Sequence, residues 1–177
     1  GSCFPKDIKA LINIANDNGY NPKLISSVES VNQAQKKVLF SKLIKELGED
    51  LTGKVIAIWG LSFKPETNDM RASTSIDLIE SIINSGGQVN AYDPKAIQEA
   101  QFYLKDFDVN YCNDKYIALE SADALILVTE WKEFRSPDFD LMKLKMKNYL
   151  FIDGRNQFHA DLMQSKGFKY VQIGVKA

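Results

Sequence analysis

The chain has 177 residues, 45% of them hydrophobic and 25% charged, and a formal net charge of −1. This composition predicts a globular protein whose core needs no disulfide or metal. Because the net charge is near zero, the protein has no overall positive field that would bind it to nucleic acid or to a membrane surface. Since no apolar run approaches the roughly 20 residues that span a bilayer, and since Cys3 and Cys112 form no spaced framework, we predict a reducing, cytoplasmic setting.

The first 51 residues are predicted to be helical. Residues 6–18 carry apolar side chains at the i, i+3, i+4 and i+7 spacing of one helix face, and Gly19 ends that helix. A second apolar helical pattern runs from Pro22 to Leu47 and predicts one helix of about 39 Å. A helix of this length serves as a spacer between domains, forms a dimer interface, or packs on its own domain, and the sequence leaves these three open.

From residue 52 onward, strand patterns alternate with helix patterns. The predicted strands are short apolar runs bounded by turn residues, namely KVIAIWG, QVNAYDP, VNYC, DALILVTEW, YLFIDGRN and KYVQIGV. The predicted helices between them are SIDLIESIINSGG with Gly86 as C-cap, AIQEAQFYLKDF, YIALESA, SPDFDLMKLKM with Ser136 as N-cap and Pro137 at its first position, and HADLMQSKG. The alternation predicts an α/β fold: a Rossmann-like, doubly wound parallel sheet of six strands over residues 52–177, preceded by a helical arm over residues 1–51.

Three segments follow strand ends, where ligands bind in such sheets: GLSFKPETNDMR, TEW and DGRN. A dinucleotide site would need G-x-G-x-x-G after the first strand, but only Gly60 is present. Lys64 and Arg71, near the start of the next helix, would instead suit phosphate oxygens. The alternative is that both cations are solvated and that Asp69 caps the helix.

Arg155 follows Gly154 at the end of the fifth predicted strand. A guanidinium at this edge can pair with phosphate or stack on a base. The alternative is a surface arginine paired with Asp153.

Cys3 lies just before a predicted helix, whose N-terminal dipole favours a thiolate. Lys6 adds positive charge, and Asp7 could orient a water or a base. The residues alone leave open whether Cys3 is a nucleophile or a structural side chain.

Four further residues receive structural interpretations. Cys112 is expected to pack as a small hydrophobe, and His159 is expected to lie on the surface or to cap a helix. Trp59 and Trp131 are expected in or beside the core. No Cys/His cluster has the spacing of a zinc site, so no metal is predicted.

Five segments together resemble the family of UDP-glucose 6-dehydrogenases. GSCFPKD resembles the family's catalytic-cysteine motif, and GLSFKPETNDMRASTS resembles its nucleotide-sugar loop, while YDPKA, TEW and DGRN follow in the family's order and spacing. The resemblance extends over essentially the whole chain. The related UDP-mannosaminuronate-forming enzymes usually carry a histidine where Ser2 stands, and GDP-mannose dehydrogenases often carry leucine where Phe4 stands. These differences favour UDP-glucose over another UDP- or GDP-hexose, which stays an alternative.

The resemblance implies a three-part subunit, of which this chain is the C-terminal piece. Residues 1–51 would be the end of a central helical region that forms a homodimer through helix 22–47, and residues 52–177 would be the UDP-sugar-binding domain. The NAD-binding domain would be absent, so the piece alone is expected to be inactive. A stand-alone UDP-sugar-binding or assembly module is the alternative of a different class, and Gly1 and Ser2 are either native or the remains of a tag.

The resemblance also implies roles for individual residues. Cys3 would attack the sugar aldehyde and carry a thiohemiacetal and then a thioester, and Asp7 would position or activate water. The residues placed beside UDP-glucose are Phe63, Lys64 and Arg155, and those placed beside NAD are Cys3, Phe4, Pro5, Lys6 and Arg71.

Overall fold

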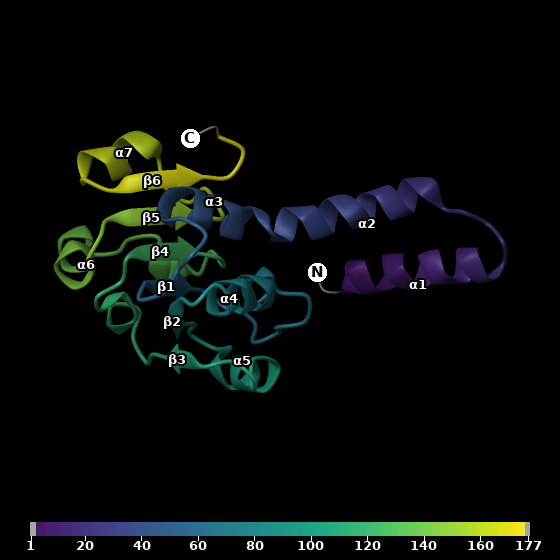
Figure 1. The fold of residues 1–177 in the computed structure, drawn as a ribbon, viewed down its shortest axis with the longest axis horizontal. Coiled ribbons are helices and arrows are strands. Elements are labelled where there is room, and N and C mark those ends of the chain that lie inside the picture. The colour runs from purple at the N-terminus through teal and green to yellow at the C-terminus, as the bar shows by residue number, and fades with distance from the viewer. Residues whose placement is uncertain (1–2, 176–177) are drawn as a thin grey trace.

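The structure, a computed structural model, describes residues 3–175 and, within them, the side chains from residue 6 onward. Over this part of the chain, six strands form one parallel sheet in the order β3-β2-β1-β4-β5-β6 (Figure 1). The strands are β1 (Val55–Trp59), β2 (Gln88–Tyr92), β3 (Val109–Tyr111), β4 (Ala124–Leu127), β5 (Leu150–Asp153) and β6 (Lys169–Gln172). The predicted six-stranded, doubly wound fold is confirmed.

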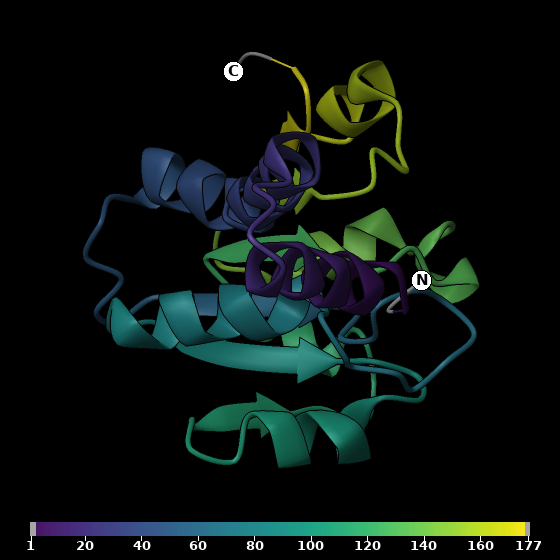
Figure 2. The same ribbon diagram turned by 90° about the vertical axis from the view of Figure 1, so that its right-hand side faces the viewer.

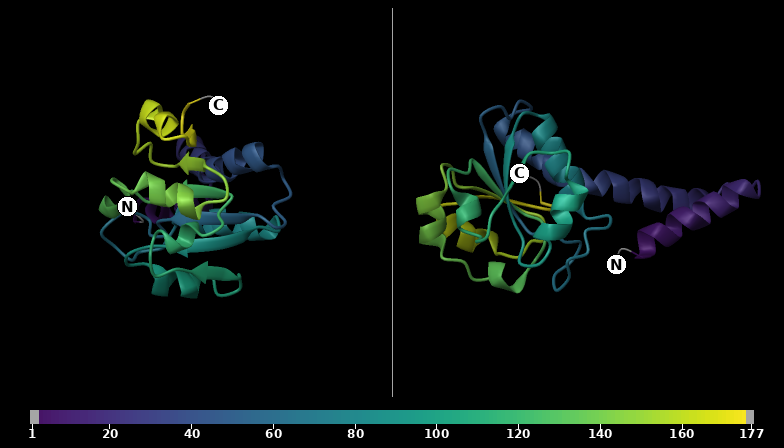
Figure 3. Two further views of the ribbon diagram at one scale, coloured as in Figure 1. Left: turned by 90° about the vertical axis from the view of Figure 1, so that its left-hand side faces the viewer. Right: turned by 90° about the horizontal axis from the view of Figure 1, so that it is seen from below.

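Helices cover both faces of the sheet (Figure 3). Ile56 and Ile58 of β1 belong to the apolar cluster shared with α3 (Val38–Leu47), α4 (Thr74–Asn84) and α5 (Ile97–Tyr103). Ala57 and Trp59 belong to the cluster shared with α6 (Phe139–Lys145), α7 (Ala160–Ser165) and the 3₁₀ turns η1 (Ile117–Leu119) and η2 (Lys132–Phe134). Since successive strand residues face opposite sides, burial on both faces explains why the strands are continuous apolar runs.

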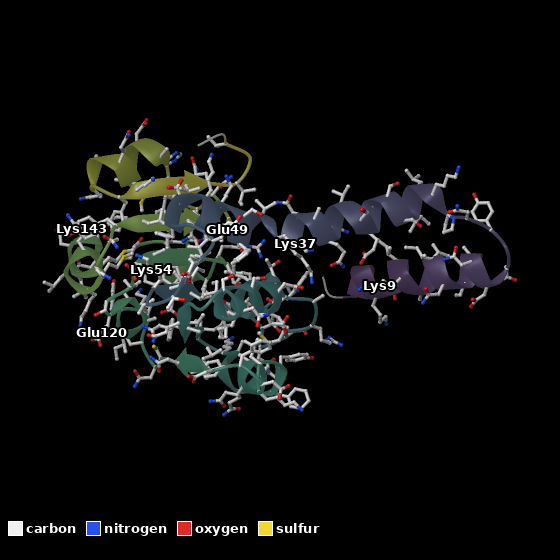
Figure 4. All side chains as sticks on the ribbon, in the orientation of Figure 1. Lys9, Lys37, Glu49, Lys54, Glu120 and Lys143 are labelled. Carbon is white, nitrogen blue, oxygen red and sulfur yellow. The ribbon has the colours of Figure 1, made fainter. Side chains whose placement is uncertain are left out.

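The helical arm projects away from the sheet on the side covered by α3, α4 and α5 (Figure 1). It consists of α1 (Cys3–Asp17) and α2 (Lys23–Lys36), which form an antiparallel helical hairpin. The predicted single helix from Pro22 to Leu47 is wrong in one respect: it is divided at Lys37, whose N–H bonds to the carbonyl oxygen of Ala34, 3.1 Å away and only three residues back. Figure 4 shows Lys37 at this junction.

The two halves of the predicted helix have different surroundings. α2 has no buried residue, whereas Leu39 and Leu43 of α3 are buried in the core beside the sheet. Packing of this kind explains the division at Lys37, because α3 follows the sheet while α2 leaves it. The division of the chain at residues 51 and 52 stays a prediction. Within residues 3–175, no helix combines the length and the apolarity that crossing a bilayer requires.

Two helix caps differ from their predictions. Asp138, not Ser136, caps α6, because its carboxylate accepts the backbone N–H groups of Asp140 and Leu141, both at 3.0 Å. At the end of α4 the C-cap is Ser85, and Gly86 follows it with a φ of +84°. At α6, Asp138 thus takes the capping position in place of Ser136, since a carboxylate can accept two backbone donors at once.

Candidate functional site

The candidate site lies at the carboxyl edge of the sheet, where the strand order reverses between β1 and β4. The segments that follow β1, β2, β4 and β5 meet there, and they contain GLSFKP, YDPKA, TEW and DGRN. In Figures 1 and 2 the first turn of α1 also faces this edge, next to the loop between β1 and α4. The fold therefore brings together the strand-end segments that the sequence singled out.

The crevice at the strand reversal is closed by contact between two loops. Gly60 has a φ of +91°, and a Cβ on it would lie 2.5 Å from the Cβ of Thr129. The Thr129 hydroxyl donates to the carbonyl oxygen of Ser62 at 2.6 Å. In a dinucleotide-binding fold this crevice is where the cofactor sits, so the switch point of this sheet does not fit a dinucleotide.

Asp93, directly after β2, stands where a dinucleotide-binding fold places its ribose-binding carboxylate. Here the residue is 1% exposed. Its Oδ2 accepts the backbone N–H of Leu61 (2.7 Å), the N–H and hydroxyl of Ser62 (3.1 and 3.2 Å) and Nε1 of Trp131 (3.0 Å). Its Oδ1 accepts the N–H groups of residues 95 and 96. The carboxylate is committed to the protein and has no capacity left for a ribose.

Hydrogen bonds join the beginning of the loop between β1 and α4 to its end. The carbonyl oxygen of Leu61 accepts the hydroxyls of Ser73 and Ser75 at 2.7 and 2.5 Å. Ser73 is the N-cap of α4 and also accepts the N–H of Ser75 at 3.3 Å. These bonds hold the N-terminus of α4, with its free N–H groups, beside the loop.

The loop itself carries three predicted site residues. Phe63 is half-buried and donates its N–H to the carbonyl oxygen of Asp69 at 2.8 Å, whereas Lys64 is exposed. The carboxylate of Asp69 accepts Nε and Nη2 of Arg71, each at 2.9 Å. Asp69 therefore does not cap α4, and the alternative that assigned it that role is wrong.

Arg155 is held at the edge by a turn built on Asp153. The buried carboxylate of Asp153 accepts the N–H of Arg155 at 2.8 Å and the hydroxyl of Tyr170 at 2.6 Å. The guanidinium pairs elsewhere: its Nε–H donates to the carbonyl oxygen of Val128 at 2.7 Å, and the same Nε lies 2.9 Å from Oε2 of Glu130. A side-chain pair between Arg155 and Asp153, the predicted alternative, is therefore wrong.

Arg155 lines a pocket of about 130 Å³ beside the arm. Among the residues that the structure describes, its two Nη groups have no hydrogen-bond partner. The other lining residues come from α2, α3, α4 and the ends of β4, β5 and β6: Gln35, Leu39, Thr74, Val128, Gly154 and Ile173. The pocket is smaller than the 300–1,000 Å³ of a typical ligand site, so it suits one group of a larger ligand.

The N-terminal motif is only partly described. α1 begins at Cys3, but the side chains of Cys3, Phe4 and Pro5 lie outside the described residues. Lys6 and Asp7 are exposed, and Nζ of Lys6 is 3.6 Å from Oδ1 of Asp7. The roles predicted for this motif stay predictions.

The structure confirms the four structural interpretations of single residues. Cys112 is buried, and burial raises the pKa of its thiol, with smaller contributions from Glu120 and Asp114. Trp59 and Trp131 are buried in the core. His159 is exposed and occupies the N-cap position of α7, but its side chain makes no capping hydrogen bond, so only its surface position is confirmed.

Sequence reasoning missed the partners that organise the edge. It located YDPKA and TEW at strand ends but gave no role to Asp93, Thr129 or Glu130. The available signal was that each is a polar residue within three positions of the end of a buried strand, where a polar group needs partners.

Two family models match the chain. The UDP binding domain of the UDP-glucose/GDP-mannose dehydrogenase family matches residues 57–160. The central domain of the same family matches residues 1–34.

Individual relatives agree with these matches. The chain is 40% identical over 174 residues to a UDP-glucose 6-dehydrogenase of Rhizobium meliloti, and 41% identical over 174 residues to UDP-glucose 6-dehydrogenase TuaD of Bacillus subtilis. Each alignment covers 98% of this chain but only 39% and 37% of the respective relative. The structure of a UDP-glucose dehydrogenase from Pyrobaculum islandicum superposes with a TM-score of 0.81 at 28% identity, over 97% of this chain and 37% of that one. The chain thus spans well under half the length of these proteins.

Proposed function

Because the chain belongs to the UDP-glucose/GDP-mannose dehydrogenase family, we propose that it forms the nucleotide-sugar side of an NAD-dependent UDP-glucose 6-dehydrogenase. The observation that carries this proposal is the guanidinium of Arg155. Its Nε–H donates to the Val128 carbonyl oxygen, and Oε2 of Glu130 lies 2.9 Å from the same nitrogen. Its Nη groups are therefore available to the pocket, which Thr74 at the N-terminus of α4 also lines. A fixed guanidinium beside helix N–H groups suits the diphosphate of UDP.

Phe63 and Lys64 extend the proposed site from the other side. The loop that carries them begins at the closed crevice and ends at the cap of α4. An exposed ammonium can reach phosphate oxygens, and a half-buried aromatic ring can face a base or sugar. We assign Phe63, Lys64 and Arg155 to UDP-glucose.

NAD does not fit the switch point of this sheet, because Gly60 and Thr129 close it and Asp93 is committed to the loops. We therefore propose that the cofactor is held mainly by another part of the enzyme. The residues of this chain assigned to its border are Cys3, Phe4, Pro5, Lys6 and Arg71. When bound, NAD supplies the hydride acceptor for both oxidations. Arg71, exposed and oriented by Asp69, suits a contact with a group brought by another domain.

The proposed chemistry of the chain centres on Cys3. The N-terminus of α1 favours its thiolate. The sulfur adds to the carbonyl carbon of the C6 aldehyde, and a proton converts the alkoxide to a thiohemiacetal. Loss of the C6 hydride, together with release of the hydroxyl proton to solvent, then leaves a thioester on Cys3. Water, positioned by Asp7, adds to the thioester, and the acid leaves as the thiol is restored.

We also propose a homodimer through residues 22–47. Leu24, Val28 and Val31 have the i, i+4, i+7 spacing of one face of α2, and their exposed fractions are 80%, 42% and 66%. Leu11 and Ile14 of α1 are exposed as well, at 49% and 59%. A contiguous apolar helix face of this kind is typical of an interface.

The cytoplasmic setting stays a prediction.

The experiment that tests the site is UDP binding by calorimetry. We expect the chain to bind UDP, and Lys64→Ala and Arg155→Ala each to weaken binding about tenfold or more, since hydrogen bonds to charged groups contribute roughly 1.5–3 kcal/mol. Lys54→Ala is the matched control, since Lys54 precedes β1 at the opposite edge (Figure 4) and should leave the affinity unchanged.

The outcomes separate the competing functions. UDP binding that does not depend on Lys64 or Arg155 would reject the site. UDP binding without a reactive Cys3 would favour a non-catalytic UDP-sugar-binding or assembly module. Preferential binding of GDP would favour a dehydrogenase for a GDP-hexose.

A further inference from the structure

Asp93 joins three loops of the carboxyl edge through one buried carboxylate. Four donors converge on Oδ2 from the loops after β1 and β4, and two converge on Oδ1 from the loop after β2. We propose that Asp93 is a positioning residue that holds Phe63 and Lys64 in place for UDP. This inference rests on the proposed function of the site.

The contacts lead from Asp93 to the loop in two steps. The carboxylate fixes the N–H groups of Leu61 and Ser62. The carbonyl oxygens of the same two residues accept the hydroxyls of Ser73 and Ser75 and of Thr129, respectively. The peptide group between Leu61 and Ser62 is therefore held through both its carbonyl oxygen and its N–H. The peptide group between Ser62 and Phe63 is held through the Ser62 carbonyl oxygen and through the Phe63 N–H, which donates to Asp69. Lys64, one residue farther on, starts from a rigid base although its own side chain is exposed.

The charge of Asp93, and not only its shape, is required by this arrangement. All six of its partners are donors, and a carboxylate can accept at each of its oxygens. An amide of the same shape would turn an NH₂ group toward either the Oδ2 donors or the Oδ1 donors. Two or more hydrogen bonds would be lost in either orientation, and donors would face donors in a buried site.

Asp123 offers a matched control within the same sheet. It is likewise 1% exposed, and it accepts the N–H of Val55 at 3.0 Å and Nδ2 of Asn148 at 2.9 Å, with Nζ of Lys147 at 3.3 Å. It precedes β4 and therefore lies at the amino edge, opposite the site. Asp123→Asn disturbs a buried carboxylate of the same kind without touching the loop.

The experiment compares Asp93→Asn with Asp123→Asn in the 177-residue chain. UDP affinity is measured by calorimetry, and amide hydrogen exchange is measured at residues 61–64. We expect both variants to melt earlier than the unmodified chain. Only Asp93→Asn should weaken UDP binding, by tenfold or more, and accelerate exchange at Leu61 and Ser62. Equal UDP affinities in the two variants, or unchanged exchange at Leu61 and Ser62, would overturn the proposal.

Two milder variants cover the case in which Asp93→Asn does not fold. Trp131→Phe and Ser62→Ala each remove one donor to Oδ2 while Asp93 keeps its charge. Each should weaken UDP binding about threefold, and no change in either would reject the positioning role. If the unmodified chain binds no UDP, the proposed function fails. The exchange rates at Leu61 and Ser62 then still decide whether Asp93 holds the loop.

Discussion

Gly60 and Thr129 are in direct contact where β1 and β4 end, and a Cβ added to Gly60 would lie 2.5 Å from the Cβ and 2.6 Å from the backbone nitrogen of Thr129. The contact joins the loop after β1 to the loop after β4, and the hydrogen bond from Thr129 to Ser62 completes the connection. The two loops therefore form one unit, and the proposed UDP site lies on it rather than in the crevice that it closes.

Gly60→Ala should lower the free energy of unfolding by about 3 kcal/mol, because the methyl group overlaps Thr129 and the residue keeps a φ of +91°. Gly53→Ala is the matched control. Gly53 also has a positive φ, +72°, but nothing lies within 4 Å of its Cβ position, so the expected loss is about 1 kcal/mol. Urea unfolding of both variants measures the difference, and equal losses would mean that the loops separate easily.

The two cysteines should differ in their rates of alkylation. Burial raises the pKa of the Cys112 thiol. Cys3 begins α1, and the proposed function requires that this helix N-terminus favour the thiolate. Iodoacetamide at pH 7 should modify Cys3 at least tenfold faster than Cys112. Cys3→Ser should abolish the fast phase and Cys112→Ser should preserve it. A fast phase that survives Cys3→Ser would argue against an activated Cys3.

Glu130→Gln should strengthen UDP binding about threefold at low salt, because it removes a negative charge 2.9 Å from Nε of Arg155. The bond to the Val128 carbonyl oxygen keeps the guanidinium in place. The gain should shrink at high salt, since ions screen the restored charge. Glu133→Gln, three residues away and exposed, serves as control. Weaker binding by Glu130→Gln would instead mean that the ion pair is needed to orient Arg155.

Two tyrosines should respond oppositely to replacement by phenylalanine. The Tyr111 hydroxyl is buried without a hydrogen-bond partner among the described residues, so Tyr111→Phe should leave stability unchanged or raise it by about 1 kcal/mol. The Tyr170 hydroxyl donates to Asp153 at 2.6 Å, so Tyr170→Phe should lower stability by about 2 kcal/mol at pH 7. Denaturant unfolding compares them, and a loss in Tyr111→Phe would reveal a partner such as a bound water.

Stability should also fall at alkaline pH. Burial raises the pKa of Tyr111 to about 12, and burial together with Asp153 raises the pKa of Tyr170. A raised pKa means that the folded state holds the proton more tightly, so this stabilisation is complete below pH 10, the unfolded value. It is lost as the pH rises from 10 through the folded values. Each Phe variant should lose less stability than the unmodified chain between pH 9 and pH 11.5.

Val31→Glu should dissociate the proposed dimer. Val31 is 66% exposed on α2, and a carboxylate there would be buried without a partner in an interface. Ser30→Glu, one residue earlier, is also exposed but points away from the Leu24–Val28–Val31 face. Sedimentation should show dimers for the unmodified chain and for Ser30→Glu, and monomers for Val31→Glu. A monomeric unmodified chain would contradict the interface.

The sequence by itself determined the order and type of nearly all the elements, because strands buried on both faces are apolar runs and amphipathic helices repeat with a period near 3.6. It also located the strand ends that carry Lys64 and Arg155. It failed at Lys37 and at the cap of α6, where the outcome depended on packing against the sheet and on which of two nearby side chains reached the backbone N–H groups.

Only the tertiary structure decided which groups are partners at the carboxyl edge. Ser62 lies 31 positions from Asp93 and 67 from Thr129 in the sequence. No pattern among neighbouring residues indicates that residues so far apart in the chain are in contact. The strand order brings these residues together, and the cost of leaving a buried carboxylate without donors selects the loop conformations in which every donor is used. The sequence therefore indicated only that Asp93 and Glu130 follow strands. The fold determined their partners: Asp93 accepts hydrogen bonds from the loops, and Glu130 pairs with Arg155.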